Sequence, residues 1–102
     1  MLLCLMKGMG LSVAAEVPTQ QGRIDLVLKM PDTIYVIEIK LNSSTQAALD
    51  QIHEKGYFQP YLRQGKQLAL LGINFASKAR NIEAWAGELR DEAGQLLRRL
   101  EP

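Results

Sequence analysis

The chain has 102 residues, of which 47% are hydrophobic and 23% charged, a balance that excludes a disordered or fibrous protein and fits one folded domain over residues 1–102. Twelve basic and eleven acidic residues leave a formal net charge of +1, so the overall charge does not mark a nucleic-acid-binding protein and any anion-binding surface has to be local. Cys4 is the only cysteine, which excludes an internal disulfide and a thiolate zinc cage and favours a cytoplasmic location.

The first ten residues carry an apolar stripe that predicts a helix beginning at or before residue 1 and ending near Gly8 to Gly10 (Leu2, Leu3, Leu5, Met6 and Met9). This run is short and has no basic segment before it, so we do not expect a secretory signal. No stretch approaches the roughly 20 apolar residues of a membrane-spanning helix, so we expect a soluble protein with no membrane partner. Because so short a chain buries only a modest core, we expect a homodimer or a larger host protein to cover part of it.

Three strands are predicted next, over residues 11–17, 22–30 and 34–41, because strand-forming residues lie between turn-forming segments. Alternation gives the second and third strands one uniformly apolar face each, made of Ile24, Leu26 and Leu28 and of Ile37, Ile39 and Leu41. The opposite face of this predicted hairpin carries Asp25, Glu38 and Lys40.

The turn over residues 31–32 decides how the charged faces meet, and it begins with a proline. A two-residue loop would pair Met30 with Thr33 and set Asp25 opposite Glu38. Such a loop needs a primed turn with positive φ, which proline cannot adopt.

We therefore favour a four-residue loop, with the proline at the second position of a type I turn. This loop pairs Met30 with Tyr35 and Asp25 with Lys40. Glu38 is then diagonal to Asp25, at a Cβ separation of about 7 Å. Either register brings the three charged side chains together.

A helix is predicted to begin at Asn42, Ser43 or Ser44 and to end at Gly56, with a second short helical turn over residues 57–63. The apolar run over residues 66–75 predicts a strand that is buried on both faces and parallel to a neighbour after this crossover. The order of elements predicts an α/β fold, with a mixed central β-sheet flanked by α-helices.

The tail has apolar residues at helical spacing, which predicts one long helix, firmest from Glu88 onward (Ile82, Trp85, Leu89, Ala93, Leu96, Leu97 and Leu100).

The charged residues of the hairpin form a candidate chemical site. Two carboxylates as close as Asp25 and Glu38 repel each other unless a cation lies between them. With a backbone carbonyl and water, they offer the oxygen ligands that Mg²⁺ or Mn²⁺ prefers. Lys40 beside such an ion can orient a water molecule and stabilise the charge that grows on phosphorus during attack. The pattern therefore predicts metal-dependent cleavage of a phosphodiester.

This pattern resembles the PD-(D/E)XK nuclease superfamily, in which an Asp on one strand is followed by (D/E)-x-K on the next. Here Asp25 is followed by Glu38-Ile39-Lys40, with Ile24 in place of the proline. The segments AEVPTQQGRIDLVL, YVIEIKLNSS, ALDQIHEKGYFQPYLRQGKQLALLGINF and SKARNI extend the resemblance over residues 11–82, to the restriction-endonuclease-like domain found at the C-terminus of AAA-ATPase-like proteins.

The resemblance implies a restriction-endonuclease-like fold and a nuclease that uses Mg²⁺ or Mn²⁺, acts on DNA and associates with an ATPase-like region. It also implies an additional edge strand around residues 79–85, against the helical spacing of the tail. Both interpretations of that segment stay open here.

The same resemblance implies roles for individual residues. Asp25 and Glu38 would hold the metal, the carbonyl of Ile39 would be a third ligand, and Lys40 would be the catalytic lysine. Glu16 aligns with an acidic position that can approach the ion, although a surface role is an equal alternative.

Gln51 resembles a helix glutamine that related nucleases place near the site, usually four residues before a tyrosine. Lys55 has that position here, and the nearest tyrosines are Tyr57 and Tyr61, which we otherwise expect in the core. His53 projects from a different side of the helix than Gln51, so we expect it to pack or face solvent.

A competing interpretation is a non-catalytic module of an ATPase-like protein that binds nucleic acid or dimerises through its tail. The intact set of Asp25, Glu38 and Lys40 favours the enzyme.

Overall fold

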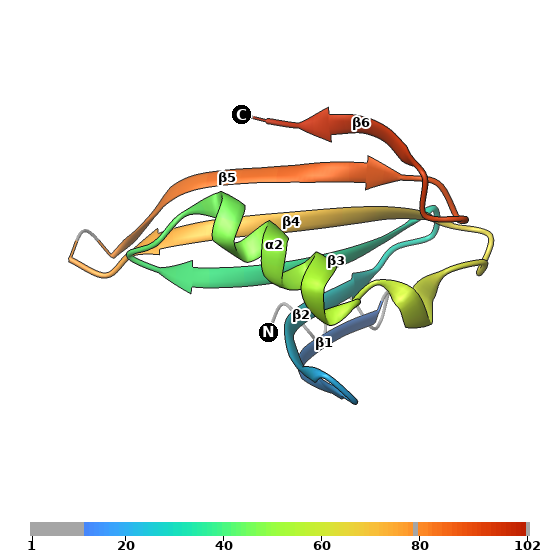
Figure 1. Ribbon diagram of the computed structural model, residues 1–102, viewed down its shortest axis with the longest axis horizontal. Helices are drawn as coiled ribbons and strands as arrows, with labels where there is room; N and C mark the ends of the chain where they lie inside the picture. The colour runs from blue at the N-terminus through green and yellow to red at the C-terminus, as the bar shows by residue number, and fades with distance from the viewer. Residues whose placement is uncertain (1–11, 79, 102) are drawn as a thin grey trace.

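The computed structural model describes residues 12–78 and 80–101, so the helix predicted over residues 1–10 lies outside the described residues. The described part forms one six-stranded sheet with helix α2 lying across one face (Figure 1). No helix in this part is long and apolar enough to cross a membrane. The elements are β1 (Ser12–Thr19), β2 (Gly22–Lys29), β3 (Thr33–Leu41), α2 (Thr45–Lys55), the 3₁₀ helix η1 (Gln59–Tyr61), β4 (Gln67–Ala76), β5 (Asn81–Arg90) and β6 (Leu96–Leu100).

The strands lie in the sheet in chain order, from β1 to β6. Neighbouring strands are antiparallel except β3 and β4, which are parallel and joined by the crossover through α2. The predicted mixed sheet and the parallel pairing are therefore confirmed. Helical cover is seen in part, because α2 packs against one face in the residues described.

Helix α2 begins and ends at residues suited to those positions. Ser44 is the N-cap, and its hydroxyl accepts a hydrogen bond from the backbone N–H of Ala47 at 3.1 Å. Gly56 ends the helix in the left-handed region, at φ +61°. The N–H groups of Gly56 and Tyr57 donate to the carbonyls of His53 and Ile52, which is the Schellman pattern. The chain therefore turns back sharply after Gly56.

The core lies between α2 and the middle of the sheet. Leu49 and Ile52 of the helix pack against buried residues of the strands, which are Ile24, Val27, Ile34, Val36, Leu68 and Leu70. The helix approaches β4 closely at Gly72, where a Cβ atom would lie 2.6 Å from the Thr45 carbonyl oxygen. Glycine is required there because any side chain would push the helix away from the sheet.

The uniformly apolar face of β3 is buried only at Ile37, which is 8% exposed. Ile34 and Val36 are fully buried under α2, and Glu38 continues the same face. Ile39 and Leu41, on the uniformly apolar face, are 43% and 65% exposed. The carboxylate of Glu38 is therefore buried because it extends the face on which the core is built.

Strand β2 also departs from strict alternation. Ile24 and Val27 are both buried in the core although they are three residues apart. In the pairing of β1 with β2, the residues before and after Glu16 have partners, but Glu16 and Asp25 are not paired with each other. Glu16 also has a positive φ of +51°. The strand is thus distorted at Asp25, as a bulge would distort it.

The predicted four-residue loop between β2 and β3 is wrong. Lys29 pairs with Ile34, and Leu26 pairs with Ile37. When this register is extended toward the turn, Met30 lies beside Thr33. When it is extended the other way, Asp25 lies opposite Glu38.

Proline at position 31 excludes a primed turn but not every two-residue loop, and neither residue of the 31–32 loop has a positive φ. Met30 N–H donates to the Thr33 carbonyl at 2.8 Å, and Gln67 N–H donates to the Asp32 carbonyl at 3.0 Å. The loop is therefore tied to the start of β4, a tertiary contact that a hairpin rule does not include.

The predicted tail helix is also wrong, because residues 81–90 and 96–100 form β5 and β6. The strand implied by the resemblance is present, but it is longer than expected and is not at the edge, since β6 pairs with it. Trp85 and Leu89 lie opposite Ile73 and Ala69 of β4, on the face away from α2.

The turn between β5 and β6 explains where a helix would have to break. Asp91 Oδ1 accepts hydrogen bonds from the N–H groups of Ala93 and Gln95, and Gly94 has φ +90°. Aspartate and glycine at these positions are typical of turns. The apolar residues of the tail therefore have helical spacing without forming a helix, because this turn interrupts the segment.

Candidate active site on β2, β3 and α2

Asp25 lies where β2 and β3 separate. The ladder between these strands ends at Leu26 and Ile37. Beyond it, Asp25 Oδ2 accepts a hydrogen bond from the backbone N–H of Ile39 at 2.8 Å. The side chain thus takes the place of a ladder partner, and its carboxylate is held against the backbone of β3 beside Glu38.

Glu38 is a buried carboxyl group, with 3% of its surface exposed. Its pKa is raised to about 8, first by burial, then by the hydrogen bond and negative charge of Asp25, while the charge of Lys40 opposes the rise. The two acidic side chains predicted to meet are therefore close enough to interact.

Gln51 joins the two ends of the site. Its side-chain Nε2 donates to Glu38 Oε2 at 3.1 Å, and its Oε1 accepts a hydrogen bond from Lys40 Nζ. Lys40 lies on the same face of β3 as Glu38, two residues along the strand. The amide therefore holds the lysine and the glutamate in a fixed relation without adding charge.

Tyr57 is a site residue that sequence reasoning assigned only to the core. Its ring is buried, and its hydroxyl lies 3.5 Å from Gln51 Nε2. The Schellman turn at Gly56 directs Tyr57 back onto the helix, so the partner of Gln51 is six residues away rather than four. The signal that could have revealed it is the glycine at the end of the predicted helix.

The structure does not bring Glu16 into this group. Its carboxylate lies 3.8 Å from Arg23 Nη1 across the strand pair, and the side chain is 76% exposed. Its assignment as a metal ligand stays a prediction. His53 faces the other side of α2 and lies 2.9 Å from Glu88, so it packs away from the site as expected.

The donor set suits a divalent cation of the Mg²⁺ type. Among residues 12–78 and 80–101, no group of three or more His, Cys, Asp or Glu side chains is placed to share a metal ion. Two carboxylates remain, and Mg²⁺ is commonly bound by one or two carboxylates with water and phosphate oxygens. A cation would also counteract the burial and the Asp25 interactions that together raise the pKa of Glu38. The residues present therefore fit the ion that the motif implies.

Comparison with known proteins places the chain in a family. The sequence model of the PD-(D/E)XK nuclease superfamily matches residues 1–85. An "Uncharacterized protein in vnfD 5'region" of Azotobacter chroococcum mcd 1 is 34% identical over 82 residues. The match covers 78% of this chain but 16% of that protein, so the chain spans a small part of its relative. No solved structure matches.

The superfamily model covers both strands of the hairpin, α2 and β4, and with them every residue of the candidate site. The described fold is a mixed six-stranded sheet with a helical crossover, consistent with a restriction-endonuclease-like domain. The chain belongs to the PD-(D/E)XK nuclease superfamily.

Proposed function

We propose that this chain is a nuclease that hydrolyses phosphodiester bonds of DNA and depends on Mg²⁺ or Mn²⁺. The observation that carries the proposal is the contact network in which Gln51 joins Lys40 to Glu38, with Asp25 beside them. A structural salt bridge would pair Lys40 with a carboxylate directly. Here a neutral amide lies between them, so two crowded carboxylates are left to receive a cation.

In this proposal Asp25, Glu38 and the carbonyl of Ile39 hold the ion. When bound, the ion supplies positive charge that lowers the energy of the phosphorane-like transition state. Asp25 has a second task, because its bond to the Ile39 N–H fixes the backbone that carries the carbonyl. The burial of Glu38 limits competition from solvent for its carboxylate oxygens.

Lys40 positions the attacking water and stabilises the charge that develops on the phosphoryl oxygens. The bond from the water oxygen to phosphorus forms as the bond from phosphorus to the 3′ oxygen breaks. The water gives up a proton and the departing 3′ oxygen takes one up from solvent, so the products are a 5′-phosphate and a 3′-hydroxyl. Gln51 acts as a positioning residue, since it restrains the ammonium through its Oε1 atom. Tyr57 in turn limits the motion of the Gln51 amide.

The partners are part of the proposal. DNA is the proposed substrate because the two carboxylates and the lysine suit a phosphodiester. Association with an ATPase-like region is proposed because the relative extends well beyond the matched segment. Association with a second copy is proposed because so short a chain buries only a modest core.

The direct test incubates the purified chain with linear, nicked and branched DNA, with Mg²⁺, with Mn²⁺ and with EDTA. We expect cutting that requires the metal and that Lys40→Ala abolishes. The matched control is Lys78→Ala, an exposed lysine beyond the end of β4, which should cut as the parent does.

Circular dichroism of the Lys40→Ala variant shows whether the fold is intact. Equal cutting by the folded variant and the parent would remove the mechanism. Binding of DNA without cutting by the parent would instead support the non-catalytic module.

A further inference from the structure

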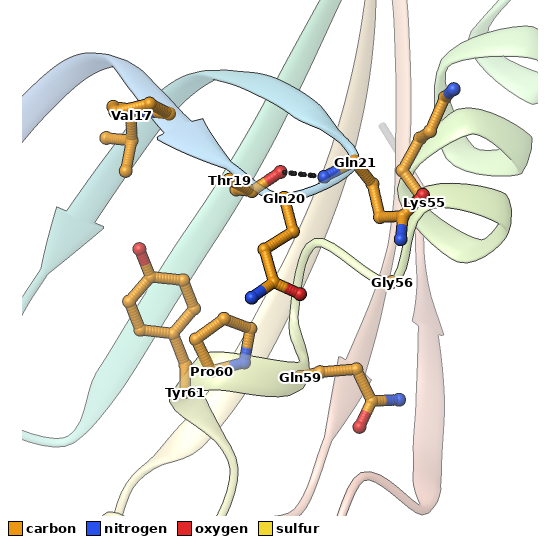
Figure 2. Close-up of a pocket in the computed structure, with 10 residues that line it drawn as sticks. Val17, Thr19, Gln20, Gln21, Lys55, Gly56, Gln59, Pro60 and Tyr61 are labelled. Carbon is orange, nitrogen blue, oxygen red and sulfur yellow. Dashed lines mark hydrogen bonds between the residues drawn. The ribbon is translucent and has the colours of Figure 1, made fainter.

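A cleft of about 550 Å³ lies between the β1–β2 turn and the end of α2 (Figure 2). Its volume falls within the roughly 300–1,000 Å³ of small-molecule sites. The hairpin turn forms one wall with Gln20 and Gln21, and η1 forms another with Gln59, Pro60 and Tyr61. None of these residues has a role in the proposed hydrolysis.

The hairpin wall is a fixed surface. Thr19 Oγ1 accepts the N–H of Gln21 at 3.1 Å and donates to the Gly22 carbonyl at 2.9 Å. This bond pair holds the turn in shape, and the side chain of Gln20 extends from the turn toward Pro60 (Figure 2). A preformed wall lowers the cost of ordering a ligand.

The cleft adjoins the candidate active site. Gly22 and Tyr57 directly follow two of its lining residues, and a Cβ atom at Gly22 would lie 2.8 Å from the Tyr57 hydroxyl. That hydroxyl lies 3.5 Å from Gln51. Lys55 lines the cleft and lies one turn after Gln51 on α2, and its ammonium extends along the helix, away from the ring of Tyr61 (Figure 2).

The lining suits part of a nucleic acid strand. It contains an aromatic ring, two proline rings and three side-chain amides, and its one charged residue is Lys55. Lys29 places a second ammonium 5.5 Å from the centre of the Tyr61 ring. An aromatic face takes a base by stacking, amides donate to and accept from base edges, and ammonium groups meet phosphates.

We propose that this cleft holds one unpaired nucleotide of the substrate strand next to the cleaved bond, with its base stacked on Tyr61 and its edge contacted by Gln20 and Gln59. A paired base inside a duplex cannot reach an aromatic ring in such a cleft. The preferred substrate is therefore single-stranded or branched. This inference rests on the proposed nuclease function, because that function supplies the strand.

The test measures binding by fluorescence anisotropy in the Lys40→Ala background with Mg²⁺, so that no cutting occurs. The probes are a single-stranded oligonucleotide, the same oligonucleotide with an abasic site at each position in turn, and a blunt duplex. Tyr61→Ala should weaken single-strand binding by about 5- to 150-fold, the range for loss of one stacked base. Tyr61→Phe keeps the ring and should bind as the parent does.

The abasic series shows whether the ring meets a base. One abasic position should reproduce the loss, and Tyr61→Ala should then weaken binding of that probe no further. Duplex binding should not change. Equal losses for duplex and single strand, or equal binding by the Ala and Phe variants, would overturn the inference.

The two proposals fail separately. If the parent cuts DNA but Tyr61→Ala and an abasic position weaken binding independently, the cleft does not hold a base, and the nuclease proposal is unaffected. The same coupling without cutting would support the cleft and overturn the nuclease.

Discussion

Two buried glutamates face α2 from the same side of the sheet, and their pKa values move in opposite directions. Glu38 on β3 is 3% exposed and Glu88 on β5 is 8% exposed. Burial raises the pKa of both, but Glu38 faces a second carboxylate and a neutral amide, so its pKa rises to about 8. The pKa of Glu88 is lowered instead, because hydrogen bonds and charges from Arg90 and His53 outweigh its burial.

The partners, not the burial, thus separate the two residues. Glu88 accepts from Arg90 at 2.8 and 3.0 Å and lies 2.9 Å from His53, so it is already paired within the protein. Arg90 also donates to the Gly94 carbonyl, which joins this group to the β5–β6 turn. We interpret Glu88 as a structural carboxylate that ties α2 to β5, and Glu38 as one that awaits a cation.

The largest expected effect is on catalysis. Glu38→Gln should lower the cutting rate by about 10³-fold, since it removes a charged ligand from the reacting centre. Glu88→Gln should leave the cutting rate of the folded protein unchanged. Rates measured on both variants under the same metal conditions test this. If the two substitutions cost the same activity, the distinction between the glutamates is lost.

For the free energy of unfolding, loss of the Glu88 ion pair should cost more than substitution of Glu38. Arg90→Ala leaves the Glu88 carboxylate buried with a weaker partner, and we expect it to lower the free energy of unfolding by about 3 kcal/mol. Glu38→Gln removes a poorly compensated buried carboxyl and should not lower it. Urea denaturation monitored by circular dichroism measures both. A Glu38→Gln variant less stable than Arg90→Ala would contradict the assignment.

Mg²⁺ should raise the free energy of unfolding only when Asp25 and Glu38 are intact. With free Mg²⁺ at tenfold its Kd, binding to the folded state adds about 1.4 kcal/mol to the free energy of unfolding. Thermal unfolding with and without Mg²⁺ should show this gain in the parent and in Glu88→Gln. The gain should be absent in Glu38→Gln and in Asp25→Asn. Its persistence in both of those variants would place the ion elsewhere.

The smallest expected effect is the loss of the stabilising contribution of Glu88 in acid. Because the pKa of Glu88 is lower in the folded state than its ordinary value of 4.5, its stabilising contribution is present above that pH and is lost as pH falls through the folded value. The stability difference between the parent and Glu88→Gln should therefore shrink as pH is lowered below about 4.5. A difference that stays constant under acid would show that the charge of Glu88 does not matter.

Much of the half of the chain that carries the site could be predicted from sequence. Turn residues, alternation and caps located the β2–β3 hairpin, α2 and β4, and the spacing of Asp25 and Glu38 indicated that they meet. These features depend on residues near each other in the chain or in one crossover. Gln51 was reached only through the family resemblance, because nothing local distinguishes it from other helix glutamines.

The remaining features depend on contacts distant in sequence. The hairpin register is fixed by the bond between Asp32 and Gln67 as well as by the turn. The tail forms strands because β5 pairs along the whole of β4, with Gly87 so close that a Cβ atom would lie 2.6 Å from the Leu70 carbonyl oxygen. Neither contact is visible in the periodicity of the segment itself.

The central claim is that Asp25 and Glu38 hold one divalent ion beside Lys40. A crystal soaked in Mn²⁺ tests it most directly, through the anomalous difference map. We predict one peak about 2 Å from oxygens of both carboxylates, with Lys40 still bonded to Gln51. A map with no peak there, or with Lys40 turned to pair with the two carboxylates, would contradict the account.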